Sequence, residues 1–241
     1  MFDIIIRNGK IIDGTGNPWF RADLGIENGK IAKIGHLDLS KAEKTVDAEE
    51  LTVCSGFIDM HSHSDMSVFF NPRFESAIMQ GITTLVTGNC GMSLAPVNPA
   101  REDLLVRHFS PFLPPGGELK IDWITFREYS ARLKENKIGS NVAQLVGHGT
   151  VRIDVMGFEN RDPTSKELEE MKALVVEAME AGAFGMSTGL IYPPGMYSKT
   201  AELIELCKVV ARYGGIYTSH IRGEGVTLMD AVKEAIDIGD K

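Results

Sequence analysis

The sequence has few cysteines, no long apolar segment, no low-complexity segment and no excess of positive charge. Its three cysteines are an odd number at wide spacing, which does not make a disulfide framework, so we expect a protein of the reducing cytoplasm. No apolar segment approaches the roughly 20 residues of a membrane span, and Met1-Phe2-Asp3 does not begin a signal peptide. The net charge of −8 argues against binding to nucleic acid or an anionic membrane, because both require clustered Lys and Arg. The remaining composition, 43% hydrophobic and 24% charged over 241 residues, is typical of a globular protein.

Two histidines end an apolar segment near residue 60. Residues 53–60 are mainly apolar, as expected of a strand buried on both faces of a parallel sheet, and they lead directly into His61 and His63. Because side chains alternate along a strand, both imidazoles should point to the same side. Nitrogen ligands at the carboxyl end of a buried strand suit zinc or another divalent metal. The alternative, a pair of solvated loop histidines, is weakened by the strand that precedes them.

The segment from Gly56 to His63, Gly-Phe-Ile-Asp-x-His-x-His, resembles the first barrel strand of the amidohydrolase superfamily. Members of that superfamily are metal-dependent hydrolases built on a distorted TIM barrel. One departure is visible, since Ser55 stands where the family usually has proline. Proline mainly stiffens the approach to the strand, so we expect the chemistry to be unaffected.

The first fifty residues predict a small β-sheet. Asn8-Gly9 and Asn28-Gly29 each lie between segments of alternating apolar residues, which is the strongest short-range signal for a hairpin. A free-standing β-domain of this size would have a marginal core. By the family resemblance, residues 1–52 are the β-hairpin part of a small β-sandwich.

From about residue 51 the pattern changes to alternating strands and helices, which predicts parallel βαβ units. Thr164-x-x-Glu167 is a capping box at the start of one of these helices. Residues 93–123, which contain five prolines, form a long insertion over the carboxyl ends of the strands, and such loops are usually functional or mobile. After the first strand, the others are expected at residues 82–87, 141–146, 183–187 and 215–219.

A TIM barrel has eight such units, and the sequence predicts five. The expected fold is therefore α/β, an incomplete TIM-like (β/α) barrel preceded by part of a small β-sandwich. Residues 53–241 would be the amino-terminal part of the barrel, with the insertion at 93–123. We expect the chain to be about half of a larger enzyme.

A cysteine between glycines ends the second barrel strand. A lone cysteine is usually a small core residue, but Cys90 lies at the carboxyl end of a strand, where TIM-barrel chemistry gathers. Thiolate is a good zinc ligand. Cys54, which precedes a strand, and Cys207, on a helix, are predicted to be packing residues instead.

Polar residues follow the other strands in the same way. His220 ends the fifth strand, and as a further candidate at a strand end it is predicted to be a metal ligand. His148 ends the third strand and is a candidate for a polar role near substrate or metal. Tyr192 lies in a Gly- and Pro-rich loop after the fourth strand and could either contact a substrate carboxylate or pack against the insertion. His108, within the insertion, is expected at the surface.

Three of these loops together narrow the resemblance. They read Gly-Asn-Cys-Gly at residues 88–91, Ser-Thr-Gly-Leu-Ile-Tyr-Pro-Pro-Gly at residues 187–195 and Ser-His-Ile-Arg-Gly-Glu-Gly at residues 219–225. They resemble the D-aminoacylase (N-acyl-D-amino-acid deacylase) family, and the resemblance covers the chain from Phe2 to Lys241. It implies zinc-dependent hydrolysis of N-acyl-D-amino acids to a carboxylate and a D-amino acid.

The resemblance also implies roles for individual residues. Cys90 and His220 would be ligands of one tightly held zinc ion, and His61 and His63 would form or support a second, weaker site. Tyr192 would lie near the α-carboxylate of the substrate. In this reading a zinc-bound water attacks the acyl carbonyl and an aspartate carries the proton to the departing amine.

Two parts of that mechanism are not found in the sequence. The family's remaining zinc histidine and its catalytic aspartate would both fall beyond Lys241, so no catalytic residue is assigned here. Asp65 is the only nearby substitute, and we expect it to support the ligands rather than to react. Residues 1–241 alone are therefore expected to have negligible deacylase activity.

Two alternatives remain open. The first is a cyclic-amide hydrolase of the same superfamily, such as a dihydroorotase or hydantoinase. Those families commonly use a carboxylated lysine at the fourth strand, and residues 184–187 contain none. The second is an inactive fragment or a subunit that needs a partner chain, because an incomplete barrel has open strand edges through which it could self-associate.

Overall fold

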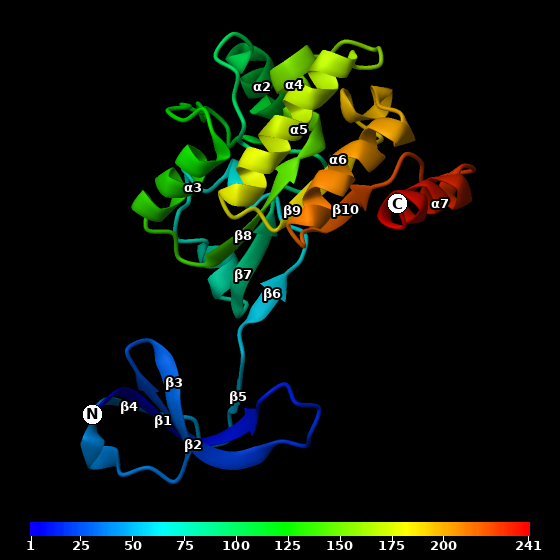
Figure 1. The fold of residues 1–241 in the computed structure, drawn as a ribbon. Helices are drawn as coiled ribbons and strands as arrows, with labels where there is room; N and C mark the ends of the chain where they lie inside the picture. The colour runs from blue at the N-terminus through cyan, green and yellow to red at the C-terminus, as the bar shows by residue number, and fades with distance from the viewer. The chain divides into compact units, whose positions relative to one another are not determined.

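The computed structural model describes residues 1–241, which divide into two compact units, Met1–Gly56 and Phe57–Lys241 (Figure 1). The sequence predicted a boundary after residue 52. Strand β5 (Thr52–Cys54) pairs with β1 (Phe2–Ile12), so residues 53 and 54 continue the first sheet instead of beginning the barrel. No helix combines the length and the apolar sequence that crossing a membrane requires.

The first unit is a five-stranded sheet. Besides β1 and β5, its strands are β2 (Phe20–Glu27), β3 (Lys30–Gly35) and β4 (Ala42–Asp47), with a 3₁₀ turn η1 (Leu39–Lys41) before β4. Strand β1 pairs antiparallel with β2, and β2 pairs antiparallel with β3. On its other side β1 pairs in parallel with β4 and β5. The small core of this sheet centres on Ile11, Ala22 and Leu24.

The two Asn-Gly pairs behave differently. Asn28-Gly29 forms the predicted turn between β2 and β3, with φ of 52° and 71° at its two residues. The hairpin predicted at Asn8-Gly9 is wrong, because β1 continues through it with a β-bulge where the β1–β2 register shifts between Ile6 and Gly9. A Cβ at Gly9 would lie 2.7 Å from Cγ2 of Val53, so the approach of β5 requires glycine there.

The second unit is built on a curled sheet of five parallel strands that forms half of a barrel, as predicted. The strands, in the order β10-β9-β8-β7-β6 across the sheet, are β6 (Phe57–Asp59), β7 (Ile82–Thr87), β8 (Asn141–Gly147), β9 (Gly185–Gly189) and β10 (Ile216–His220). Strand β6 departs from the prediction of a strand buried on both faces. It has a single neighbour, β7, and Phe57 and Ile58 are exposed.

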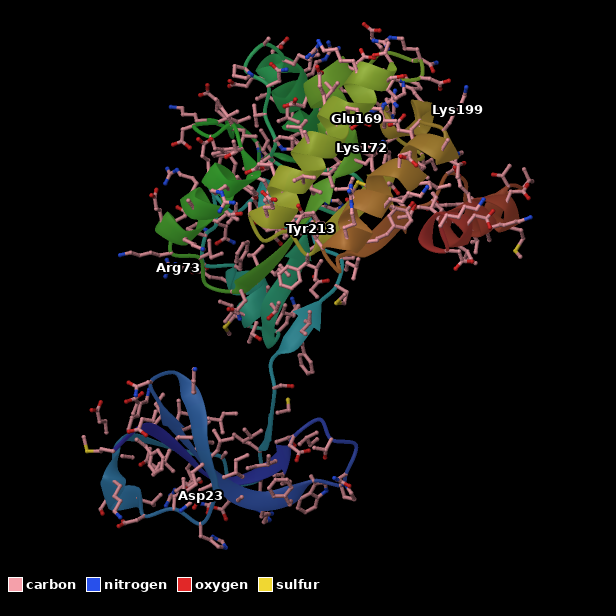
Figure 2. The ribbon with its side chains drawn as sticks, viewed as in Figure 1. Asp23, Arg73, Glu169, Lys172, Lys199 and Tyr213 are labelled. Atoms are coloured by element: carbon pink, nitrogen blue, oxygen red, sulfur yellow. The ribbon has the colours of Figure 1, made fainter.

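Helices connect the strands, and α5 (Ser165–Glu180) and α6 (Thr200–Arg212) run along one face of the sheet (Figure 1). The other helices are α1 (Glu75–Ile78), α2 (Glu102–Phe109), α3 (Phe126–Glu135), α4 (His148–Met156) and α7 (Leu228–Gly239). The capping box predicted for α5 is present, with Thr164 accepting from the Glu167 backbone and Glu167 accepting in return. Helices α5 and α6 pack together, and Lys172 of α5 donates to Glu205 of α6. Lys172 also donates to Glu169 on its own helix (Figure 2).

The insertion at 93–123 has secondary structure of its own, which its proline-rich sequence did not predict. It contains α2 and a 3₁₀ turn, η3 (Ser110–Phe112), and further 3₁₀ turns occur at η2 (Ser64–Met66) and η4 (Gly195–Tyr197). Leu105 and Phe109 of α2 are buried in the main core. The indole of Trp123 donates to the carbonyl of Leu94 at 2.7 Å, which ties the end of the insertion to its beginning.

Candidate metal centre

The histidine pair lies just beyond β6. The strand ends at Asp59, whose carboxylate accepts from the His61 amide at 3.1 Å, so the chain turns before the pair instead of extending through it. The rings of His61 and His63 nevertheless lie side by side, with centroids 5.5 Å apart at 71°. His61 is exposed and His63 is half-buried.

Cys90 lies in a sharp turn after β7. Its φ is 55°, a conformation that non-glycine residues rarely adopt. The preceding Gly88 also has a positive φ, and a Cβ there would lie 2.0 Å from the carbonyl oxygen of Leu145. Asp65, which is buried, accepts from the Gly88 amide at 3.0 Å and so holds the turn in place. The turn brings the Cys90 thiol back over the end of the sheet.

The Cys90 sulfur meets two of the histidines. Sγ is 3.2 Å from Nε2 of His61 and 3.6 Å from Nδ1 of His220, which ends β10. One ligand atom each from His61, His63 and Cys90 lie within 4.8 Å of one another. Residues 130 positions apart thus converge because the carboxyl ends of parallel strands share one edge.

The donor set suits zinc. For tetrahedral Zn²⁺ with usual bond lengths, a sulfur and a nitrogen ligand lie roughly 3.6 Å apart. The two separations at Cys90 are close to this value. In addition, Nδ1 of His63 is buried without any hydrogen-bond partner, and an unsatisfied buried nitrogen is costly unless a ligand completes it.

The local electrostatics match this chemistry. Burial, followed by the charges of His61 and His220, lowers the pKa of His63, which keeps its imidazole in the neutral form that binds metals. Burial and then the charge of Asp65 raise the pKa of the Cys90 thiol. A cation is therefore needed to hold Cys90 as the thiolate.

Tyr192 lies beside these residues. Its hydroxyl is 3.0 Å from Nδ1 of His220, and the two rings meet edge to face with centroids 4.8 Å apart. The other ring nitrogen of His220 is 2.9 Å from Glu224. Tyr192 and His220 are thus in contact, and both are half-buried.

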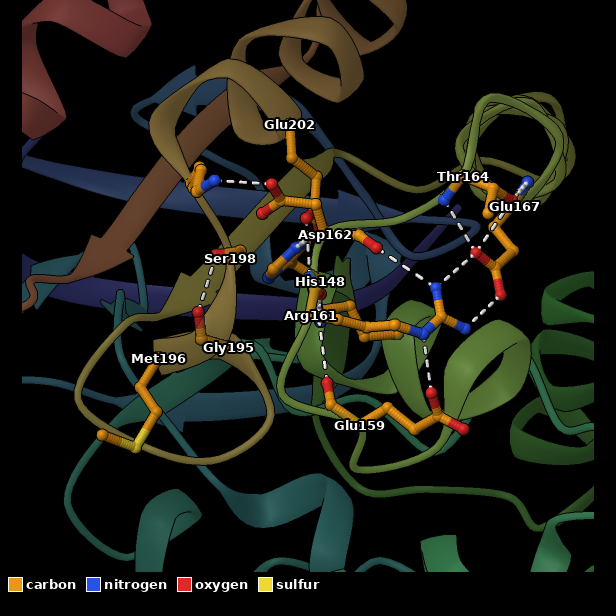
Figure 3. Close-up of polar contacts among 12 residues, drawn as sticks. His148, Glu159, Arg161, Asp162, Thr164, Glu167, Gly195, Met196, Ser198 and Glu202 are labelled. Atoms are coloured by element: carbon orange, nitrogen blue, oxygen red, sulfur yellow. Dashed lines mark hydrogen bonds and ion pairs between the residues drawn. The ribbon is translucent and has the colours of Figure 1, made fainter.

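His148 does not join this group. It begins α4, is completely buried, and its Nε2 is 2.8 Å from Oε1 of Glu202 on α6 (Figure 3). Arg152 donates to the other carboxylate oxygen of Glu202 at 2.6 Å. Burial raises the pKa of Glu202, but the bonds and charges of His148 and Arg152 lower it by more, so it lies below its ordinary value. The ring of His148 has no exposed surface through which it could contact a substrate in this structure.

The other cysteines separate in the same way. Cys207 is buried on α6, as predicted for a packing residue, whereas Cys54 is exposed in β5. The prediction that Cys54 is a packing residue is wrong, because its side chain is exposed. Neither thiol lies in the group formed by His61, His63 and Cys90.

A cavity lies beside the candidate metal centre, and most of the residues that form it were not predicted from the sequence. The cavity, of about 490 Å³, is bounded by His63 and Cys90 on one side and by His108, Phe112 and Phe158 among its other walls. His108 was expected at the surface but is half-buried here, with its ring centroid 5.6 Å from that of Phe158. The aromatic residues of the insertion could have indicated a cavity wall. Their spacing in the sequence, however, does not show which of them face the metal centre.

Comparison with known proteins agrees with this geometry. The amidohydrolase family model matches residues 44–231. D-aminoacylase from Alcaligenes xylosoxydans xylosoxydans is 40% identical over 242 residues, which cover 99% of this chain and 48% of that protein. The chain therefore spans about half the length of this relative.

Solved structures of deacylases also resemble this chain over its whole length. A D-aminoacylase crystal structure superposes with a TM-score of 0.85 at 38% identity, covering 100% of this chain and 49% of that chain. The N-acyl-D-glutamate deacylase of Bordetella bronchiseptica, solved with zinc and a phosphonate inhibitor, superposes with a TM-score of 0.88 at 40% identity, covering 99% and 49%. Since the family match extends over most of the sequence, the chain belongs to the amidohydrolase family.

Proposed function

We propose that this chain provides the metal-binding part of a zinc-dependent hydrolase that splits N-acyl-D-amino acids into a carboxylate and a D-amino acid. The observation that carries the proposal is the convergence of the Cys90 thiol on His61 and His220 at 3.2 and 3.6 Å, with His63 beside them. The similarity to D-aminoacylase and to a zinc-bound N-acyl-D-glutamate deacylase supports the choice of metal and substrate class.

In this proposal Cys90 and His220 hold one zinc ion tightly, and His61 and His63 form or support a second, weaker site. A bound zinc ion supplies a water whose pKa is lowered towards about 7, which makes hydroxide available at neutral pH. The high pKa of the buried Cys90 thiol means that it releases its proton only on binding a cation.

Tyr192 is proposed to contact the α-carboxylate of the substrate. Its hydroxyl now shares a hydrogen bond with Nδ1 of His220. When that nitrogen is used as a ligand it can no longer take part in this bond, and the Tyr192 hydroxyl becomes free to donate. Ligand binding and substrate orientation would then be linked through one short contact.

Proton transfer is not provided for within these residues. The group formed by His61, His63 and Cys90 contains no carboxylate. Asp65 is buried against the Gly88 amide, and Glu224 is paired with His220. We therefore propose that residues 1–241 alone bind metal but turn over substrate at a negligible rate. Turnover of N-acetyl-D-methionine by the purified chain, abolished by a chelator, would contradict this.

The alternatives have less support. A cyclic-amide hydrolase with a carboxylated lysine at the fourth strand is disfavoured because β9, Gly-Met-Ser-Thr-Gly, contains no lysine. We propose a cytoplasmic location and a small-molecule substrate, on the grounds that all three cysteines are free and the net charge is −8.

The test is the zinc content of the purified chain, measured by elemental analysis beside Cys90→Ala and the matched control Cys54→Ala. We expect about one tightly held zinc per chain, lost in Cys90→Ala and retained in Cys54→Ala, whose thiol is exposed and outside the group. Equal zinc contents in wild type and Cys90→Ala would overturn the assignment of Cys90 as a ligand.

A further inference from the structure

Ser187 lies in the middle of β9 and contacts the turn that carries Cys90. Its side chain is completely buried. The hydroxyl accepts from the Gly91 amide at 2.9 Å and donates to the carbonyl of Gly88. These two backbone groups lie on either side of Cys90 in the chain. One hydroxyl, whose single proton is used in the second bond, therefore closes the turn around Cys90.

The turn requires such support because its backbone conformation is unusual. Gly88, Cys90 and Gly91 all have positive φ, of 76°, 55° and 73°. Glycine adopts this conformation readily, whereas at Cys90 the Cβ atom makes it costly. A residue of this kind persists only where the surrounding contacts fix it. If those contacts were lost, a return to negative φ would turn the thiol away from His61 and His220.

The turn also lies directly against the backbone of β9. A Cβ at Gly91 would be 2.8 Å from the Gly189 amide nitrogen, and one at Gly189 would be 2.1 Å from the carbonyl oxygen of Cys90. The two segments approach this closely because both positions are glycine. Near the start of α4, the Thr150 amide donates to the Gly91 carbonyl at 3.1 Å. The ends of β9 and α4 thus support the turn, and Ser187 is the residue of β9 whose side chain bonds to it.

We propose that Ser187 is a positioning residue for the Cys90 ligand. Its hydroxyl holds the turn in the metal-binding conformation before a cation arrives, so that zinc binds without a rearrangement of the backbone. Strand β9 contains no His, Cys, Asp or Glu, and through Ser187 it contributes to the metal centre without supplying a ligand. The inference rests on the proposed function only in taking Cys90 as a zinc ligand. Residues that orient a ligand typically change metal affinity by about 10- to 100-fold.

The experiment measures the zinc affinity of the purified chain by competition with a chromophoric chelator. Ser187→Ala removes both bonds to the turn, and its dissociation constant for zinc should rise about 10- to 100-fold. Ser198→Ala is the matched control, because Ser198 is also buried and its hydroxyl donates at 2.6 Å to the Gly195 carbonyl, which is not part of the turn. The zinc affinity of this control should stay within about twofold of wild type, since no contact with a ligand-bearing segment is lost.

Hydrogen exchange in the metal-free chain distinguishes positioning from a general loss of stability. The Gly91 amide should be protected in wild type, because its acceptor is present without metal. In Ser187→Ala this amide should exchange about tenfold faster, the effect of losing one hydrogen bond, while the amides of β7 keep their rates. Ser198→Ala should leave the Gly91 rate unchanged. A variant that is only less stable would instead accelerate exchange in β7 and at Gly91 together.

Three results would contradict the role of Ser187, and they separate it from the proposed function. Equal zinc affinity in wild type and Ser187→Ala would overturn the positioning role and leave the proposed function standing. Rapid exchange of the Gly91 amide in the metal-free wild-type chain would do the same, and that measurement does not depend on a variant that folds. A wild-type chain that binds no zinc would overturn both.

Discussion

Arg152 is the largest side chain that the structure buries completely. Its guanidinium donates to Glu202 at 2.6 Å and to the backbone carbonyl of Arg161 at 3.0 Å, and the same carboxylate binds His148. Burial of a charge is costly unless it is paired and hydrogen-bonded. These contacts connect α4 to α6 and to the segment before α5.

We predict that Arg152→Met destabilises the second unit by about 3–5 kcal/mol, because it leaves the Glu202 carboxylate buried without the guanidinium that pairs with it. Urea unfolding measures the effect. The control is Arg73→Met, since Arg73 is 81% exposed and pairs with Glu75 at the surface, where loss of the pair should cost less than about 1 kcal/mol. Similar costs for the two variants would show that the buried pair contributes little.

Asp154 lies on α4, the helix that also carries Arg152, and it should make the free energy of unfolding depend on pH. Burial raises its pKa to about 6, the charge of Arg101 opposes this and that of Glu170 adds to it. Because the folded-state pKa is above the ordinary value, the folded chain binds the proton more tightly. Its stabilising contribution is complete below about pH 4 and is lost as the pH rises through 6.

We predict that Asp154→Asn flattens this decline. Asp154 is only partly buried, so the change in unfolding free energy between pH 4 and 7 should be about 1 kcal/mol after allowance for solvent screening. Chemical unfolding at a series of pH values measures it. Asp240→Asn, at an exposed position after α7, should leave the wild-type pH profile intact. A profile unchanged by Asp154→Asn would contradict the assignment.

At the scale of elements, two helices begin with complete capping boxes. Thr125 and Glu128 form one at α3, and Thr164 and Glu167 form the other at α5. Arg161 donates two bonds to Glu167, at 2.6 and 2.7 Å, and with the Thr164 amide it lowers the pKa of that carboxyl far below its ordinary value (Figure 3). The capping box at the start of α5 is therefore connected, through Arg161, to the segment whose backbone carbonyl accepts a hydrogen bond from Arg152.

We predict that Thr164→Ala costs about 1 kcal/mol of unfolding free energy, because the amide of Glu167 loses its acceptor. Ser165→Ala, one residue later and also exposed, removes a hydroxyl that caps nothing and should change stability by only a few tenths. Thermal or urea unfolding compares the two. Equal effects would mean that the capping bond is not what stabilises this helix end.

On the scale of the whole molecule, the sheet of the second unit ends in two strands with free edges. In the second unit β6 and β10 each have one strand neighbour. Exposed apolar residues lie on or beside these strands, including Phe57, Ile58 and Ile216. Unpaired strand edges with apolar side chains are templates for association. These edges fit the expectation that the chain self-associates or takes a partner chain.

We predict that the purified chain associates in a concentration-dependent way and that Ile58→Lys, a charge on β6, weakens this association by tenfold or more in dissociation constant, an estimate of about 1.4 kcal/mol or more. Sedimentation velocity at several concentrations measures it. Met79→Lys is the matched control, because Met79 is 85% exposed but lies after α1, outside the strands. A chain that stays monomeric at all concentrations would contradict the prediction.

Local patterns predicted much of the fold. The five strands of the second unit, the capping box at Thr164 and the turn at Asn28-Gly29 all follow from short-range propensities that the tertiary structure does not override. Asn8-Gly9 has the same local preference for positive φ, but the close approach of β5 converts it into a bulge. Burial on β6 was predicted wrongly because an apolar sequence does not show how many neighbours a strand has.

The residues of the candidate site also separate into those predicted from local sequence and those placed by tertiary structure. The sequence by itself determined which residues stand at strand ends, because strand boundaries are local, and so it identified His61, His63, Cys90 and His220 as candidates. Only the tertiary structure decided that His148 turns into a buried pair with Glu202, 54 positions away, and that His108 turns towards the metal centre. These outcomes depend on which faces of distant helices meet, and that is set by packing of the whole core rather than by any segment alone.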